Sequence, residues 1–155
     1  MPPDAVTDAD ALRALAEATS VSEVMVTDVV CLSMDTSIDA VVDLFLEKDL
    51  AQAPVVDAAW RPLGMVSKND LLRLFDAQQR GLMVGEARVS HVAVPSVISI
   101  HHNASLSVAA AIMANEGVHA LPIVAPGGEV VGVVSTLDVI RWLAKKTGMH
   151  GSDSP

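Results

Sequence analysis

The amino-acid sequence contains an internal repeat. At an offset of 68 residues, positions 21–73 align with positions 89–141 without a gap, and thirteen of the 53 pairs are identical. A chance alignment of a chain this rich in Val and Ala would give roughly four or five. One copy buries too little apolar surface to be stable alone, so we expect the two copies to share one core. The identical pairs are Val21/Val89, Ser22/Ser90, Val24/Val92, Val26/Val94, Val29/Val97, Ser37/Ser105, Pro54/Pro122, Val56/Val124, Gly64/Gly132, Val66/Val134, Ser67/Ser135, Asp70/Asp138 and Arg73/Arg141.

Each copy predicts the same order of elements. A short extended segment (29–32; 97–100) precedes a helix, whose apolar residues recur at helical spacing. A strand that starts with Pro follows (54–56; 122–124), then a turn, a second strand (63–66; 131–134) and a second helix. We therefore predict a mixed α/β (α+β) fold of two β-α-β-β-α repeats, packed sheet to sheet in pseudo-two-fold symmetry. The apolar helix residues are Ile38, Val41, Val42, Phe45 and Leu46 in one copy, and Leu106, Ala109, Ala110, Met113 and Ala114 in the other.

The repeat divides the 155 residues into five segments. We expect an N-terminal extension at 1–20 with a helix from Asp10 to Ala18, the first repeat at 21–75, a linker at 76–88, the second repeat at 89–143 and a C-terminal tail at 144–155. With 51% hydrophobic and 19% charged residues, the chain has the composition of a folded globular protein.

Charge and cysteine content exclude several classes of protein. The net charge is −9, and residues 1–60 hold twelve acidic and two basic side chains. Nucleic acids and anionic membranes require a basic face, so neither is an expected partner. Cys31 is the single cysteine, which excludes an intrachain disulfide and favours a reducing compartment. The N-terminus lacks the basic start and apolar run of a signal peptide, and no apolar stretch is long enough to span a bilayer. We expect a cytoplasmic protein without membrane insertion.

Three sequence features resemble the tandem cystathionine-β-synthase (CBS) domain pair, or Bateman module, over about residues 21–143. They are the opening segment 24–27, the apolar-Pro-apolar-apolar strand of both copies, and the motif Gly-x-Val-Ser-x-x-Asp, which ends at Asp70 and at Asp138. Each feature is weak alone. Their order, spacing and duplication make the resemblance specific.

The Ser-x-x-Asp motif has two interpretations. Ser67 and Ser135 are good N-cap residues, and Asp70 and Asp138 three positions later complete a capping box. A helix N-terminus also offers free N–H groups to an anion, and a nearby carboxylate can accept hydrogen bonds from ribose hydroxyls. The resemblance favours the second interpretation.

The resemblance implies two pseudo-symmetric clefts that bind adenosine nucleotides, with each Asp on the ribose and the Ser/Thr near the phosphates. Backbone groups before the strand Pro and near the other copy's first strand would surround the adenine. One cleft would use Ser135, Thr136, Asp138, His119, Ala120, Leu121, Thr27 and Val29. The other would use Ser67, Lys68, Asn69, Asp70, Ala51, Gln52, Ala53 and Val97.

The two clefts are not equivalent in sequence. Gly117 follows the first helix of the second copy, at a position where left-handed backbone is common, and Asp49 replaces it in the first copy. The extra negative charge of Asp49 should make an anion prefer the Asp138 site, although Lys68 could supply a phosphate contact at the other. Few cations are available for a phosphate: His119, Lys68, Arg73, Arg88 and Arg141. An uncharged or singly phosphorylated adenosine ligand is therefore easier to accommodate than a triphosphate, which would need a metal ion such as Mg²⁺.

These observations predict a stand-alone regulatory module that binds an adenosine-containing ligand and transmits binding as a conformational or dimer change. We expect a homodimer, no required cofactor and no enzymatic activity, because no nucleophile and base pair stands out. His91, His101 and His102 do not form a metal site in this interpretation, since adjacent strand residues point to opposite faces. The alternative is a ligand-free adaptor, in which the Asp residues only cap helices and the acidic first copy docks a basic partner.

Overall fold

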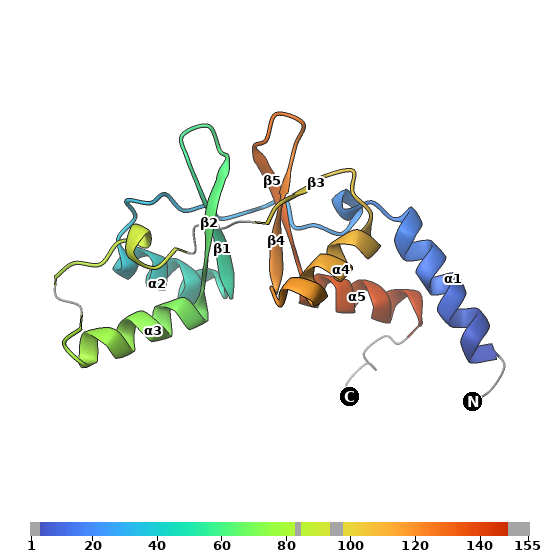
Figure 1. Ribbon diagram of the computed structural model, residues 1–155, viewed down its shortest axis with the longest axis horizontal. Helices are drawn as coiled ribbons and strands as arrows, with labels where there is room; N and C mark the ends of the chain where they lie inside the picture. The colour runs from blue at the N-terminus through green and yellow to red at the C-terminus, as the bar shows by residue number, and fades with distance from the viewer. Residues whose placement is uncertain (1–3, 83–84, 94–97, 149–155) are drawn as a thin grey trace. The chain divides into compact units, whose positions relative to one another are not determined.

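The computed structural model describes residues 4–82, 85–93 and 98–148, which form two compact units (Figure 1). The β1–β2 unit comprises Asp28–Ser99 and Pro126–Val130. The β4–β5 unit comprises Met1–Thr27, Ile100–Ala125 and Val131–Pro155. Each unit therefore contains segments of both sequence copies. No helix in the described part of the chain is both long and apolar enough to cross a membrane.

The β1–β2 unit is a two-stranded sheet with two α-helices and a short 3-10 helix. Its elements are α2 (Ile38–Lys48), β1 (Gln52–Val56), β2 (Pro62–Ser67), α3 (Lys68–Gln79) and η2 (Val89–His91). The strands β1 and β2 are antiparallel, and Leu32 adds a parallel bridge to Val55. The core of this unit consists of Leu32, Ile38, Val41, Phe45, Ala53, Val55, Val66, Leu74, Ala87 and Val89.

The apolar stripe of α2 is only partly buried. Ile38, Val41 and Phe45 lie in the core, whereas Val42 is 37% and Leu46 is 77% exposed. Helical spacing alone groups all five residues, but residues 42 and 46 are turned away from the direction that 38, 41 and 45 share. The side chains of Val42 and Leu46 therefore form an apolar surface outside the core.

The β4–β5 unit has a three-stranded sheet in the order β3-β4-β5. Its elements are α1 (Asp4–Ala18), η1 (Val21–Glu23), β3 (Ile100–His101), α4 (Leu106–Glu116), β4 (Ala120–Val124), β5 (Val130–Ser135) and α5 (Thr136–Lys146). Strand β3 is parallel to β4, with Ile100 opposite Ile123. The mixture of helices and small sheets confirms the predicted α+β class. The N-terminal helix begins at Asp4 and not at Asp10 as predicted, because its Ala-rich sequence sustains a longer helix.

The opening residues of each copy pack against the helix of the other copy. In the β4–β5 unit, the N–H of Val21 donates to the carbonyl of Ala104, and the N–H of Leu106 donates to the carbonyl of Thr19, both at 2.8 Å. In the β1–β2 unit, Val89 donates in the same way to Thr36 at 2.9 Å. Val21 and Val89 are completely buried. This exchange explains why each compact unit combines residues from both copies.

Candidate functional site

Each Ser-x-x-Asp motif forms a complete capping box. In the β1–β2 unit, Oδ2 of Asp70 accepts hydrogen bonds from the backbone N–H of Ser67 (2.8 Å) and from its hydroxyl (2.9 Å). The Ser67 Oγ accepts in return from the N–H of Asp70 at 3.3 Å. Ser67 ends β2 in extended backbone and begins α3 as its N-cap. The strand-to-helix junction thus fixes the position of the carboxylate.

The β4–β5 unit repeats this geometry. Oδ2 of Asp138 accepts from the N–H and the hydroxyl of Ser135 at 2.8 and 2.9 Å, and Ser135 Oγ accepts from the N–H of Asp138 at 3.2 Å. The capping interpretation of the motif is therefore correct as far as Oδ2 is concerned. Capping leaves the second carboxylate oxygen, Oδ1, available for another contact.

The two Oδ1 atoms differ. Oδ1 of Asp70 lies 3.7 Å from Nη1 of Arg73, one turn further along α3. Arg141 occupies the matching position on α5, but among the described residues Oδ1 of Asp138 has no hydrogen bond or ion pair. Oδ1 of Asp138 is therefore the less encumbered hydrogen-bond acceptor of the two.

Backbone hydrogen bonds bring the strand starts to the helix N-termini. The N–H of Lys68 donates to the carbonyl of Ala51, and the N–H of Thr136 donates to the carbonyl of His119, both at 2.9 Å. Gln52 pairs with Ser67 across β1 and β2. The structure thus places Ala51 and Gln52 beside Lys68 and Ser67 in the β1–β2 unit, and His119 beside Thr136 in the β4–β5 unit.

The predicted site residues differ in exposure. Ala51, Lys68, Asn69 and His119 are exposed, and Gln52 and Thr136 are half-buried. Ala53 and Leu121 are each only 1% exposed, and Ala120 is also buried. The side chains of these three residues belong to the core, so only their backbone groups could contact a ligand.

Thr27 lies next to β5. Val26 forms an antiparallel bridge with Val133, with N–H to carbonyl distances of 2.9 and 3.0 Å, which places the exposed Thr27 at the strand that ends at Ser135. Val29 is half-buried and belongs to the β1–β2 unit. Val97, the predicted counterpart of Val29, lies outside the described residues.

Two predicted features near the sites have clear local roles. Nη1 of Arg88 donates to the carbonyl of Asp35 at 2.7 Å, which ties η2 to the segment before α2, so this guanidinium already has a partner. Asp49 and Gly117 both adopt left-handed backbone, with φ of 52° and 66°. This left-handed conformation has a steric cost for Asp49, which has a Cβ, and none for Gly117.

The other residues considered in the sequence are the histidines and Cys31. The described residues contain no group of three or more His, Cys, Asp or Glu that could hold a metal ion. The rings of His101 and His102 lie 6.0 Å apart between centroids. Burial raises the pKa of the half-buried Cys31 thiol, which reduces its thiolate fraction and its reactivity at neutral pH.

A duplicated α+β unit with a Ser-x-x-Asp cap at each strand-to-helix junction defines a tandem-repeat module. The family model of the CBS domain matches residues 21–77 and 89–145. The chain therefore belongs to the CBS domain family and carries two such domains in tandem.

Solved structures of similar fold include CBS pairs with bound adenosine compounds. CBSX2 from Arabidopsis thaliana, solved in complex with AMP, is 26% identical with a TM-score of 0.73, covering 83% of this chain and 98% of that one. The CBS pair of protein MJ0100, in complex with 5′-methylthioadenosine and S-adenosyl-L-methionine, has a TM-score of 0.74 and the same coverage. At 18% identity, MJ0100 shows the similarity of fold alone.

Curated relatives are longer than this chain. It spans 41% of the length of one relative and 24% of another. The second is a homoserine O-acetyltransferase of Methanohalobium evestigatum, 22% identical over 125 residues that cover 81% of this chain. The similarity thus involves only a quarter of that enzyme.

Proposed function

We propose that this protein is a regulatory module that binds an adenosine-containing ligand at its Ser-x-x-Asp sites. The observation that carries the proposal is the Oδ1 atom of Asp138, which stays available while Oδ2 caps α5. A carboxylate held in this way can accept hydrogen bonds from ribose hydroxyls. The AMP complex of CBSX2, a relative with 26% identity, supports adenosine as the ligand class.

The N-terminus of α5 would receive the phosphate of such a ligand. In the first turn, the N–H groups of Thr136 and Asp138 already donate to the His119 carbonyl and the Ser135 hydroxyl, so the N–H of Leu137 and the hydroxyl of Thr136 would contact the phosphate. This site offers few cations, so AMP or an uncharged adenosine compound suits it better than ATP, for which Mg²⁺ would have to offset the extra charge. We infer that the Asp138 site fills first, because Arg73 competes for the carboxylate at the Asp70 site.

We also propose that the protein works as a homodimer and has no catalytic activity of its own. Leu72 and Phe75 on α3 are exposed, and so are their repeat counterparts Ile140 and Leu143 on α5. Exposed apolar residues at matching positions of both copies favour association with a second copy. Ligand binding would then be transmitted through a difference in affinity between two arrangements of the dimer. Sedimentation of a Phe75→Asp/Leu143→Asp variant tests the dimer and should show a monomer.

A thermal-shift series with AMP, ADP, ATP with and without Mg²⁺, NAD and S-adenosylmethionine tests ligand binding. We expect AMP to raise the melting temperature, and Asp138→Asn to remove most of that rise. Asn can still accept a hydrogen bond from Ser135, so the cap is largely kept while one acceptor is lost. Asp70→Asn is the matched control and should reduce the rise less. If no ligand changes the melting temperature at about 1 mM, the adaptor interpretation replaces this one.

A further inference from the structure

The two copies cap the short 3-10 helix that opens each repeat with different side chains. In the β4–β5 unit, Oε2 of Glu23 accepts a hydrogen bond from the backbone N–H of Ser20 at 2.9 Å. In the β1–β2 unit, Nδ1 of His91 accepts from the backbone N–H of Arg88, also at 2.9 Å. Glu23 and His91 occupy the same position of the repeat. An imidazole in one copy thus replaces a carboxylate in the other.

The hydrogen bond to His91 depends on the protonation state of the ring. A backbone N–H can only donate, so Nδ1 of His91 accepts only while it carries no proton. An imidazolium has two N–H donors and no acceptor, and it would face the N–H of Arg88 with a second donor. Imidazole is the side chain that ordinarily changes charge between about pH 5 and pH 8, where a Glu carboxylate stays largely ionised. Acidification therefore removes the cap of η2 and leaves that of η1.

The turn η2 also lacks the second cap that η1 has. The Oγ of Ser20 accepts from the N–H of Ser22 at 3.3 Å, in addition to the bond that Glu23 makes. Arg88 occupies the position of Ser20, and a guanidinium has five donors but no acceptor. In the part of the chain that the structure describes, the side chain of His91 is therefore the one cap at the start of η2.

The capped turn lies where the start of the second copy is attached to α2. Residues 86–93, which we call the η2 segment, contain the completely buried Val89. The N–H of Ser90 donates to the carbonyl of Met34 at 3.0 Å. Arg88 forms an isolated antiparallel bridge with Ser37, the N-cap of α2. The atom that His91 caps therefore belongs to the residue that joins the η2 segment to the start of α2.

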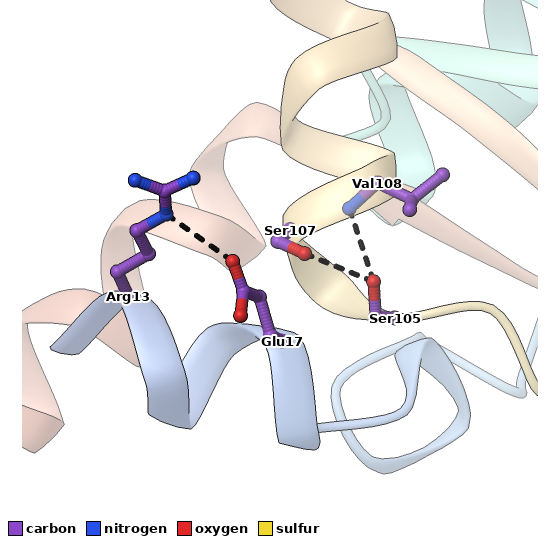
Figure 2. A network of polar contacts seen from close by, with 5 residues as sticks. All are labelled: Arg13, Glu17, Ser105, Ser107 and Val108. Carbon is purple, nitrogen blue, oxygen red and sulfur yellow. Dashed lines mark hydrogen bonds and ion pairs between the residues drawn. The ribbon is translucent and has the colours of Figure 1, made fainter. Parts of the chain in front are cut away.

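The β4–β5 unit has the same arrangement at the start of α4. Ser20 forms the matching bridge with Ser105, which caps α4 by accepting from the N–H of Val108 at 3.3 Å (Figure 2). In each unit the capped turn thus lies beside the N-cap of the helix on which it packs. The two attachments differ in the chemistry of the cap and not in its place.

Four charged residues belong to the segments that meet at η2. Glu86 and Arg88 lie in the η2 segment, and Asp35 and Asp39 lie just before α2 and in its first turn. Among the residues with described structure, none of these groups forms an ion pair with His91. Carboxylates and guanidinium groups ordinarily keep their charge between about pH 6 and pH 8. The imidazole is therefore the group at this position whose charge changes in that range.

We propose that His91 makes the attachment of the η2 segment to α2 sensitive to pH, while Glu23 keeps the corresponding attachment in the other unit insensitive. While the ring is neutral, Nδ1 caps η2 and the segment stays on α2. As the pH falls and the ring gains a proton, the N–H of Arg88 loses its acceptor and the segment opens more often. This device belongs to the β1–β2 unit and does not depend on a bound ligand.

Hydrogen exchange of backbone amides, followed by NMR on the full-length chain without ligand, tests the proposal. The wild type is compared with His91→Glu, which installs the cap of the other copy. At about pH 5.5 we expect the Val89 and Ser90 amides to exchange about fivefold faster in the wild type than in the variant, because one hydrogen bond is lost. At about pH 7.5 the two proteins should agree within about twofold.

Two further variants locate the effect. Glu23→His should transfer it to the β4–β5 unit, where the Val21 amide should then exchange faster than in the wild type at about pH 5.5. His101→Gln is the matched control, because His101 is an exposed histidine outside both turns, and it should leave the exchange of the Val89 amide unchanged. Circular dichroism shows whether each variant is folded.

Three results would overturn the proposal. The first is equal exchange of the Val89 amide in the wild type and in His91→Glu at about pH 5.5. The second is a difference of the same size at both pH values, which would mean that Glu is simply the stronger cap. The third is a ¹⁵N spectrum in which the neutral ring of His91 carries its proton on Nδ1, because that nitrogen could not then accept from Arg88.

Discussion

Asp138 accepts both of its hydrogen bonds from Ser135 through a single oxygen, Oδ2, at 2.8 Å from the backbone nitrogen and 2.9 Å from the hydroxyl. Asp70 and Ser67 repeat this relationship in the other unit. One carboxylate can therefore hold a strand-to-helix junction and still present a second oxygen outward. Capping and ligand binding, which compete as interpretations of the sequence, are compatible in the structure.

The Ser hydroxyls contribute to stability whether or not a ligand is bound. Ser135→Ala removes the acceptor for the N–H of Asp138 and one donor to its carboxylate, so it should lower the free energy of unfolding by about 1 kcal/mol. Ser67→Ala should cost a similar amount. Urea denaturation measures both, with the exposed Ser90→Ala as a control that stays within about 0.5 kcal/mol of wild type. Equal stability of all three variants would show that the caps contribute nothing.

Arg73 should weaken ligand binding at the Asp70 site. Its guanidinium lies 3.7 Å from Oδ1 of Asp70, and the pair is largely solvent-exposed on the Arg side. Arg73→Ala removes this ion pair and should raise the affinity of the Asp70 site for AMP by up to about fivefold, because exposed ion pairs are worth at most about 1 kcal/mol. Calorimetric titration should detect the change, and Arg141→Ala should leave the Asp138 site unaltered. A weaker Asp70 site after Arg73→Ala would instead mean that this cation binds the ligand.

Asp49→Gly should stabilise the protein. Asp49 has a φ of 52° at the end of α2, a left-handed conformation that costs a residue with a Cβ more than it costs glycine. We expect a gain of about 0.5–1 kcal/mol in thermal or chemical denaturation. The opposite change in the other copy, Gly117→Ala, should destabilise by a similar amount, since Gly117 has a φ of 66°. If both substitutions shift stability in the same direction, backbone strain is not the cause.

Gly132→Ala should disturb the contact between β5 and the opening segment of the chain. A Cβ at this position would collide with the side chain of Met25 and lie 3.0 Å from the carbonyl oxygen of Val26. The Met side chain can move, but the backbone carbonyl belongs to the bridge that places Thr27 beside β5. We expect a loss of about 1–3 kcal/mol, measured by urea denaturation. In a Met25→Ala background, part of that loss should be recovered, and no recovery would mean that the backbone alone is responsible.

The sequence predicts the parts of this protein that depend on local patterns. Apolar spacing indicates α2 and α4, and Ser67 and Ser135 mark the starts of α3 and α5. Pro54 and Pro122 indicate β1 and β4, although both strands begin two residues earlier than predicted, at Gln52 and Ala120. These elements can be predicted from the sequence because turns, caps and apolar periodicity depend on residues only a few positions apart. The duplication and the order of the motifs also identify the CBS domain family, which the family model confirms.

Long-range packing decided the rest. No local pattern predicts that Val21 and Val89 pack against the helix of the other copy. This packing depends on hydrogen bonds between residues more than 50 positions apart, from Val21 to Ala104 and from Val89 to Thr36. Local sequence also does not tell whether Oδ1 of Asp70 or Asp138 has an ion-pair partner. Both motifs have the Ser-x-x-Asp pattern followed by an Arg, and only the position of the Arg73 side chain shows that Asp70 has such a contact. Helical spacing likewise groups Leu46 with the apolar residues of α2, and only the packing of this helix shows that Ile38, Val41 and Phe45 are buried whereas Leu46 is exposed. Sequence determined the elements and their caps through short-range chemistry, and tertiary structure decided which surfaces and atoms those elements leave open.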